Sequence, residues 1–396
     1  MGRFVLSRRC RVHSPVGVLY SWSALLWGLQ AAFLAPVLAL LLVTLYGATP
    51  ADIGWVLSIY NAAGFVATIL IPAWADRHRN YLRPMLICAA LTVALAGTLA
   101  LATSLPMAVV ALVALGAPGS VGSTLLFAEL RHSGVGVAVL MQTRAIVSVA
   151  WVAGPPLATL IMGVAGNRSI LPVLAGLGVL NVVGTLAMAS ARRRPFDDAA
   201  PETSFEAGGL RIGKVALVGI VVAFTLLQAT NAAVTSIMTL YVTDDLGLAL
   251  LWGGVVLGVA AFLEVPAFWL IGRLSGRYSS RALMVSGCVA GIVFYVGLVF
   301  ASGPVVLLAL QVPNAWFFAI VAGTGLSVFQ DSIPKPGLAT GLNMNTRRIG
   351  AVISGPIIAI ASVESLGFPG IFAVCAGLTV VALVILLIAQ PRSAAH

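Results

Sequence analysis

The chain has 396 residues, of which 60% are hydrophobic and 9% are charged. A water-soluble domain carries charged side chains at roughly a quarter of its positions, so this chain has too few charges to cover a globular surface in water. Most of its surface must face lipid. The formal net charge of +10 does not indicate a nucleic-acid-binding protein, because the basic residues stand in short clusters between apolar runs, as topology determinants do.

Twelve apolar runs follow one another along the chain, each long enough to cross a bilayer. The first six span about 17–46, 51–75, 82–103, 106–128, 135–163 and 169–191, and the second six about 213–243, 248–272, 279–302, 304–328, 337–362 and 366–390. We therefore predict an all-α membrane protein of 12 transmembrane helices in two pseudo-symmetric halves. The domains are an N-terminal six-helix bundle (1–191), a polar cytoplasmic linker (192–212) and a C-terminal six-helix bundle (213–396).

The distribution of Lys and Arg predicts the orientation. If the N-terminus is cytoplasmic, only four of the 22 basic residues fall outside the segments on that side, namely Arg144, Arg168, Arg347 and Arg348. Such a bias predicts a multi-pass protein of the plasma membrane (the cell inner membrane) with both termini in the cytoplasm. The basic N-terminal segment runs directly into the first apolar run, so we expect a retained first span and no cleaved signal peptide.

The two sets of runs also resemble each other. A shift of 200 residues places Gly54 on Gly254, Arg77 on Arg277 and Cys88 on Cys288. Residues 141–146 are echoed by 344–349, and a Gly-Pro pair follows each copy. This shared order indicates a duplication of six spans around a central cavity.

The loop after the second run carries a motif in which Asp76 and Arg77 are followed by further basic residues, and 272–277 repeats part of it. This motif resembles the cytoplasmic loop signature of the major facilitator superfamily. Pro72 stands where the signature has glycine, and Gly276 replaces the acidic residue in the second copy. The resemblance implies that Asp76 and Arg77 form an inner gate, in which Asp76 faces a helix N-terminus or an arginine. The alternative is that the arginines only set topology.

Several further short motifs occur in an order that resembles the sugar efflux transporter family within that superfamily. This resemblance covers most of the chain and implies proton-linked export of mono- or disaccharides and their glycosides, an antiport that needs no cofactor. The expected partners are the small-molecule substrate, protons and the lipid bilayer, with the protein acting as a monomer. The motifs are 126–129, 144–156, 263–266, 329–331 and 345–350.

Polar side chains inside spans cost roughly 2.5–3.5 kcal/mol on insertion scales, so they gather on an interior face. Their positions within the runs predict one polar zone near the membrane midplane. Amides suit a neutral polyol because each both donates and accepts, and a tryptophan can stack on the apolar face of a sugar ring. The alternative is that the amides join helices and the tryptophans pack in lipid or core. The predicted substrate-binding residues are Gln30, Asn61, Arg144, Trp151, Gln228, Asn231, Asn314, Trp316 and Arg347.

Glu264 is the only acidic residue well inside an apolar run. Low-dielectric surroundings disfavour its charged form, which makes it the leading candidate for proton coupling. A permanent ion pair with Arg144, Arg347 or Arg348 that only locks packing is the alternative. Arg144 and Arg347 hold equivalent places in the two halves, where they bind sugar hydroxyls or tune Glu264, or reach to the interface instead.

Other functions remain open. The first is proton-coupled export of lipophilic drugs or of another metabolite, for which a more apolar and aromatic cavity is expected. A membrane enzyme is disfavoured because the sequence has no P-loop, no His-Glu-x-x-His and no Gly-x-Ser-x-Gly. No metal site is expected, since the four histidines are scattered in loops and termini. Glu129, His132 and Asp331, near the cytoplasmic ends of runs, are expected to be solvated.

Overall fold

The computed structural model describes residues 15–133, 137–191, 213–332, 336–360, 363 and 366–389, and every regular element in these ranges is a helix. The first half contains α1 (Pro15–Leu34), α2 (Leu38–Tyr46), α3 (Pro50–His78), α4 (Leu82–Leu101), α5 (Leu105–Ala111), η1 (Leu112–Gly116), α6 (Ala117–Gly119), α7 (Gly122–His132), α8 (Val137–Ala165), η2 (Asn167–Ser169) and α9 (Ile170–Ala191). The second half contains α10 (Lys214–Leu240), η3 (Tyr241–Asp245), α11 (Leu250–Leu274), α12 (Ser280–Val299), α13 (Pro304–Ala319), η4 (Ile320–Thr324), α14 (Gly325–Ser332), α15 (Pro336–Ala359) and α16 (Gly367–Ala389).

Within the described residues, 10 helical segments are long and apolar enough to cross a membrane, and the bent pair α1–α2 makes an eleventh. Helix α15 is not among them and contains both Arg347 and Arg348. It nevertheless lies where the sequence predicts the 337–362 span, between α14 and α16. The arrangement therefore agrees with the predicted twelve helices, and the predicted linker at 192–212 lies outside the described residues.

The first span is broken. Helices α1 and α2 meet at an angle of 49° across residues 35–37. Pro36 has no backbone N–H, so the carbonyl of Ala32 has no donor four residues further on. Val37 donates to the carbonyl of Leu34 at 3.3 Å, one residue closer than in an α-helix. Non-helical backbone of this kind is tolerated at membrane depth only where protein or a water-filled cavity surrounds it.

The second span begins and ends with well-defined caps. The Thr49 side chain accepts from the Asp52 amide while the Asp52 carboxylate accepts from the Thr49 amide, a reciprocal capping box. Pro50 occupies the first turn, where its missing N–H is not needed. The helix ends at Arg79, whose φ of 48° places it in the left-handed region. Helix α3 is therefore fixed at both membrane surfaces by local sequence.

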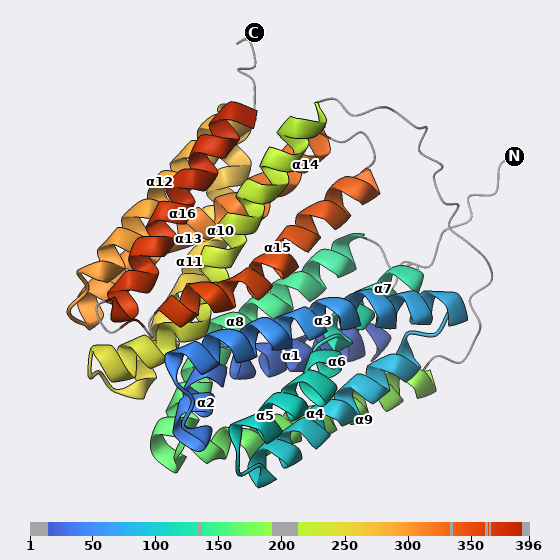
Figure 1. Cartoon of the computed structure of the whole chain (residues 1–396). Helices are drawn as coiled ribbons and strands as arrows, with labels where there is room; N and C mark the ends of the chain where they lie inside the picture. The colour runs from blue at the N-terminus through green and yellow to red at the C-terminus, as the bar shows by residue number, and fades with distance from the viewer. Residues whose placement is uncertain are drawn as a thin grey trace, which may run out of the picture.

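The two halves pack by the same scheme, as Figure 1 shows. In the first half α1 packs on α8 and α9, and α4 packs on α9; in the second, α10 packs on α15 and α16, and α12 packs on α16. The halves meet through α8 with α11 and through α3 with α15. Each pair of contacts has its counterpart in the other half, so the fold has the predicted pseudo-symmetry.

The halves touch most closely at one end of the molecule. Gly54 on α3 lies against the carbonyl of Gly355 on α15, and a Cβ on either glycine would collide with the other's backbone. On the opposite side, Gly254 of α11 contacts Pro155 of α8 in the same manner. From this end the helices diverge toward the end where α7 and α14 lie (Figure 1). The structure is thus closed at the Gly54 end and wider at the other.

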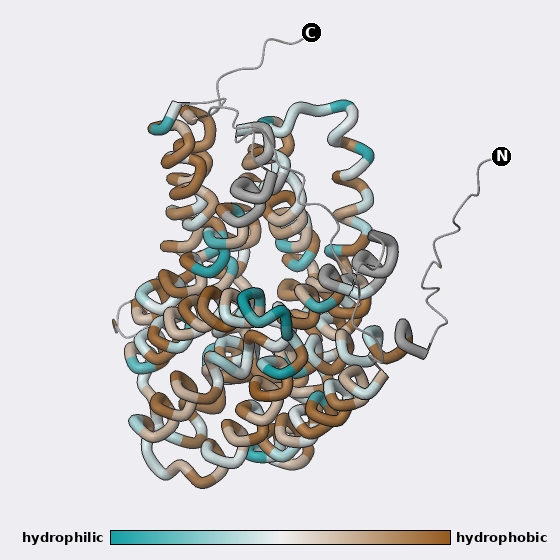
Figure 2. The backbone as a smooth tube through the Cα atoms, turned by 90° about the vertical axis from the view of Figure 1, so that its right-hand side faces the viewer, coloured by the Kyte–Doolittle hydropathy of each residue, from teal (hydrophilic) through white to brown (hydrophobic). Residues whose placement is uncertain are grey.

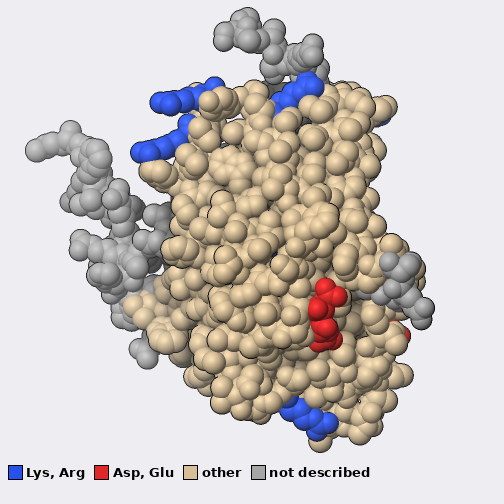
Figure 3. Space-filling view, turned by 90° about the vertical axis from the view of Figure 1, so that its left-hand side faces the viewer, with Lys and Arg blue, Asp and Glu red and all other residues tan. Residues whose placement is uncertain are grey.

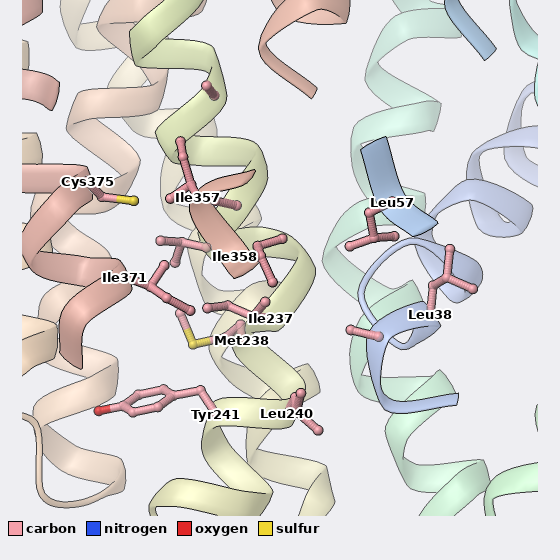
Figure 4. Packing of buried hydrophobic residues seen from close by; sticks show 14 of the residues in the cluster. Leu38, Leu57, Ile237, Met238, Leu240, Tyr241, Ile357, Ile358, Ile371 and Cys375 are labelled. Carbon is pink, nitrogen blue, oxygen red and sulfur yellow. The ribbon is translucent and has the colours of Figure 1, made fainter. Parts of the chain in front are cut away.

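The exterior is apolar, as a lipid-facing surface requires. Figure 2 shows hydrophobic residues along much of the tube, with hydrophilic residues at several helix ends and in a few turns near the middle of the molecule. On the face seen in Figure 3, charged side chains form a few separate groups on an otherwise uncharged surface. The buried core is also apolar: Met238 of α10 lies beside Ile371 of α16 (Figure 4), and the Tyr241 ring of η3 packs on Phe372.

We expect Gly54→Val to disfavour the conformation described here, because its side chain would force α3 away from the backbone of Gly355. Overpacking costs about 1–3 kcal/mol, which corresponds to a shift of roughly 5- to 150-fold in a two-state equilibrium. Distances between spin labels on residues 79 and 280, at the wide end, measure that shift. Gly64→Val on the same helix is the control, because a Cβ there meets only Ser120 Oγ at 4.0 Å. Equal distance distributions for the two variants would contradict the role of the glycine contact.

Candidate substrate-binding site

A cavity of about 420 Å³ lies between the halves at the break of the first span. Its wall comes mainly from α1, α3, α4 and the η1–α7 segment of the first half, together with Arg347 from α15 of the second. Leu34, Ala35 and Leu38, which flank the break, are part of this wall. The lining residues are Trp27, Gln30, Ala31, Leu34, Ala35, Leu38, Tyr60, Asn61, Gly64, Thr92, Leu95, Gly116, Ser120, Ser123 and Arg347.

Gln30, on α1, is the centre of the polar part of this wall. Its side chain is only 8% exposed, and both ends of its amide are hydrogen-bonded. Gln30 Nε2 donates to Thr92 Oγ1 at 2.9 Å, and Asn181 Nδ2 donates to Gln30 Oε1 at 3.0 Å. These bonds join α1 to α4 and α9, so one amide ties together three spans of the first half.

Asn61 lies at the boundary between the halves. Its Nδ2 donates to the carbonyl of Ala351 at 3.0 Å, and one turn earlier Ser58 donates to the carbonyl of Val352 at 2.7 Å. These two bonds join α3 to α15 across the interface. The sequence left open whether Asn61 lines a cavity or joins two helices. In the structure it does both.

Arg347 is the charged residue of the cavity wall. Its side chain is exposed, although α15 packs on α3 and α10 in the middle of the molecule, because it borders the cavity. Glu264 on α11 is half-buried and interacts electrostatically with Arg347. The structure thus places the one predicted intramembrane acid near one of the two predicted arginines.

The other predicted residues lie apart from the cavity wall. Gln228 is buried on α10 beside Gly350 of α15. A Cβ on Gly350 would lie 2.8 Å from the Cβ of Gln228. Asn314 donates to Gln311 of its own helix at 2.8 Å, and Trp316 donates to Ser286 of α12 at 3.2 Å. Asn231 on α10 and Trp151 on α8 are half-buried. These five residues do not belong to the described lining of the cavity.

Arg144 falls within α8, but its side chain is outside the part of the structure that is described, as are those of His132 and Asp331. For this reason the predicted equivalence of Arg144 and Arg347 rests on their positions in the two helices, each preceding the Gly-Pro pair of its span.

The predicted gate residues Asp76 and Arg77 are exposed at the end of α3. The carboxylate of Asp76 accepts a hydrogen bond of 2.5 Å from the Tyr81 hydroxyl, within its own loop. Burial, and then the hydrogen bond to Asp76, raises the pKa of Tyr81 to about 12, so the hydroxyl stays a proton donor at neutral pH. In this conformation Asp76 is held by the loop that bears it.

Glu129 was expected to be solvated, and this is wrong, since the side chain is 1% exposed. Ser133 donates to its backbone carbonyl at 2.7 Å, and the Tyr20 hydroxyl lies 3.2 Å from Ser133 Oγ. Helix α7 packs against both α1 and α4, and this packing covers Glu129. Its position near the end of a span had suggested that it was open to water.

The sequence did not indicate several residues of the cavity wall, nor Asn181, which bonds to Gln30. Thr92, Ser120 and Ser123 carry small hydroxyl side chains, which apolar runs tolerate, so they do not stand out in the sequence. Asn181 is different, because it is an amide in the middle of the 169–191 run, and the criterion that selected Asn61 applies to it equally. Trp27 and Tyr60 are aromatic residues on α1 and α3 that the sequence does not distinguish from core.

The chain matches the model of the Major Facilitator Superfamily over residues 20–355. It is 31% identical to sugar efflux transporter A of Escherichia coli over 366 residues, which cover 91% of this chain and 92% of that protein. It is 30% identical to sugar efflux transporter B of Salmonella typhimurium over 346 residues, 86% of this chain and 87% of the other. Sugar efflux transporter A of Dickeya chrysanthemi is 32% identical with the same coverage.

Solved structures share the fold at lower identity. The nucleoside transporter NupG aligns with a TM-score of 0.75 and 16% identity, covering 95% of this chain and 99% of that one. The D-xylose–proton symporter aligns with a TM-score of 0.70 and 12% identity, covering 95% and 97%. The chain is therefore a multi-pass membrane transporter, not an enzyme. It belongs to the Major Facilitator Superfamily and, within it, to the family of the sugar efflux transporters.

We expect Gly122→Ala to lower the thermal unfolding midpoint, because a Cβ at this position of α7 collides with the indole ring of Trp27 in the cavity wall. Overpacking costs about 1–3 kcal/mol. Gly176→Ala in α9 is the matched control, since a Cβ there meets nothing within 4 Å. Replacing a helical glycine by alanine in open space stabilises by roughly 0.5–1 kcal/mol, so the two variants should move the midpoint in opposite directions. A Gly122→Ala protein as stable as the control would show that Trp27 is not packed as described.

Proposed function

We propose that this protein is a proton-coupled exporter of sugars or small glycosides that works by alternating access. The observation that carries the proposal is a cavity whose wall combines Gln30 and Asn61 of the first half with Arg347 of the second. A solute held there touches both halves at once, so its binding energy depends on how the halves are placed. That dependence is what a rocking mechanism requires.

The chemistry of the wall supports a neutral polyhydroxylated solute. Its hydrogen-bonding groups are amides, hydroxyls and one guanidinium, and Trp27 and Tyr60 add aromatic surface. Amides and hydroxyls both donate and accept, as sugar hydroxyls do. Relatives of 30–32% identity that cover most of the chain are named for sugar efflux, which supports the substrate class and the direction of transport.

The proposed conformation is open to the cytoplasm. Basic residues, among them Arg79, Arg273 and Arg277, stand at the ends of α3 and α11 away from the Gly54 contact, and clusters of arginine mark the cytoplasmic side. The protein then lies in the plasma membrane with both termini in the cytoplasm. In this state Tyr81 holds Asp76, and closure of the gate moves Asp76 toward a helix N-terminus or an arginine of the other half.

Glu264 is the proposed proton carrier. It lies within electrostatic range of Arg347, which borders the cavity, so loss or gain of its proton changes the field at the solute. Protonation of Glu264 from the outside frees Arg347 from its interaction with Glu264. Loss of that proton to the cytoplasm restores the interaction. This exchange links one proton-binding group to one solute-binding group without a cofactor.

We expect Arg347→Gln to weaken sugar binding by roughly 10- to 100-fold, since a hydrogen bond to a charged group contributes about 1.5–3 kcal/mol. Arg348→Gln is the matched control, because it removes a charge from the next residue of α15, whose side chain is not part of the cavity wall. Isothermal titration of the purified protein with D-glucose, D-galactose, lactose and their methyl glycosides measures the effect. Equal losses in both variants would remove Arg347 from the site.

For coupling, we expect Glu264→Gln to abolish sugar efflux driven by a pH gradient while sugar–sugar exchange continues, because the variant binds solute but cannot lose a proton at this position. Reconstituted vesicles with and without the gradient separate the two activities. Asp244→Asn, an exposed acid in η3 at the Gly54 end, should leave both unchanged. Full gradient-driven efflux by the Glu264→Gln protein would contradict the assignment, and transport of a lipophilic dye in place of every sugar would favour a drug exporter.

A further inference from the structure

A continuous line of hydrogen bonds runs behind the cavity wall through three helices. Asn181 Nδ2 of α9 donates to Gln30 Oε1 at 3.0 Å, Gln30 Nε2 donates to Thr92 Oγ1 at 2.9 Å, and Thr92 Oγ1 donates to the carbonyl of Cys88 at 3.1 Å. Asn181 is 1% exposed, Gln30 8% and Thr92 3%. Gln30 and Thr92 line the cavity, whereas Asn181 stands behind them.

The directions of these bonds fix which way the Gln30 amide faces. Thr92 has one hydroxyl hydrogen, which Cys88 accepts, so its oxygen is an acceptor toward Gln30. Asn181 presents an N–H to Gln30. Turning the Gln30 amide over would set N–H against N–H on one side and oxygen against a hydroxyl oxygen without a free hydrogen on the other. With Asn181 and Thr92 oriented in this way, only one orientation of the Gln30 amide makes both hydrogen bonds.

The helices are held close enough to keep this arrangement rigid. Gly178 of α9, one turn before Asn181, lies where a Cβ would come within 2.7 Å of Val93 Cγ2 on α4. Gly119 of α6 lies where a Cβ would come within 3.1 Å of Thr92 Oγ1. Gly178 thus lets α9 approach α4 closely, and Gly119 lets the backbone of α6 approach Thr92 itself.

The side chain of Asn181 is only partly hydrogen-bonded. Its Oδ1 is buried and has no hydrogen-bond partner among the described residues, and a buried acceptor without a partner destabilises a fold. Asn181 does supply the donor that faces Gln30. The amide of Gln30, which lines the cavity, retains one N–H and one lone pair that the network does not use.

We propose that Asn181 and Thr92 are positioning residues that lock the Gln30 amide, so that it binds two neighbouring hydroxyl groups of the solute, donating to one and accepting from the other. This inference rests on the proposed function, because it assumes that the cavity receives a sugar. It adds a rule of specificity: the preferred solutes carry an intact pair of adjacent hydroxyls, and a monodeoxy analogue that lacks either member binds less well.

The test compares the tightest-binding sugar of the panel with its monodeoxy derivatives, by titration calorimetry, in variants that break the line of bonds. Asn181→Leu and Thr92→Val should weaken binding of the parent sugar about tenfold and lose the preference over one deoxy derivative. Thr92→Ser, which keeps the hydroxyl, should restore both. Thr185→Val is the matched control: Thr185 is equally buried on α9 and bonds to the carbonyl of Asn181 within that helix, so binding should not change.

Thermal unfolding separates positioning from structure. Asn181→Leu removes the hydrogen bond to Gln30 and also a buried acceptor without a partner, so the unfolding midpoint should stay close to that of the unmodified protein while binding falls. Two results would overturn the positioning role. In the first, Asn181→Leu and Thr92→Val bind every sugar as the unmodified protein does. In the second, they lose stability and bind parent and deoxy sugars with equally reduced affinity. If the unmodified protein binds no sugar of the panel, it is the proposed function that fails.

Discussion

Every polar group inside the bilayer must find a partner within the protein or face a water-filled space, because lipid offers none. This constraint explains most of the arrangement of the helices. It turns the amides of α1, α3 and α9 inward, and places the break at residues 35–37 beside a cavity. It also accounts for the low hydropathy of α15, whose polar residues need the shelter of both halves. The cavity is lined by polar side chains that would be unfavourable in contact with lipid.

The sequence predicted the fold well because the signals for it are strong and local. Apolar runs of about 20 residues, alternating clusters of arginine and a repeat between halves each point to the same twelve-helix plan. The break of the first span was not predicted. The 17–46 run is one apolar stretch, and Pro36 within it indicates a kink but not the angle of that kink. The 49° bend depends on how α2 packs against α10, which only the tertiary structure contains.

The site was predicted less completely, for a physical reason. Position along a span gives the depth of a side chain but not its direction around the helix. Gln30, Asn61 and Arg347 line the cavity, whereas Asn314 and Trp316 bond to neighbours in their own half. Glu129 shows the converse error, since a residue near a span end is buried when adjacent helices cover it. Asn181 was missed although it lies in the middle of its run as Asn61 does; its contact with Gln30 depends on how α9 packs on α1, which only the tertiary structure contains.

The fourth and tenth spans each contain a π turn, η1 after the 7 residues of α5 and η4 after the 16 residues of α13. A π turn contains one residue more than the α-helix it interrupts, and each added residue rotates the remainder of the span by about 100° around the helix axis. Ser120 and Ser123 come after η1 and line the cavity. Their direction around the span therefore depends on the extra residue of η1: a chain without that residue would have the same serines in its sequence but would turn a different side of the span toward the cavity.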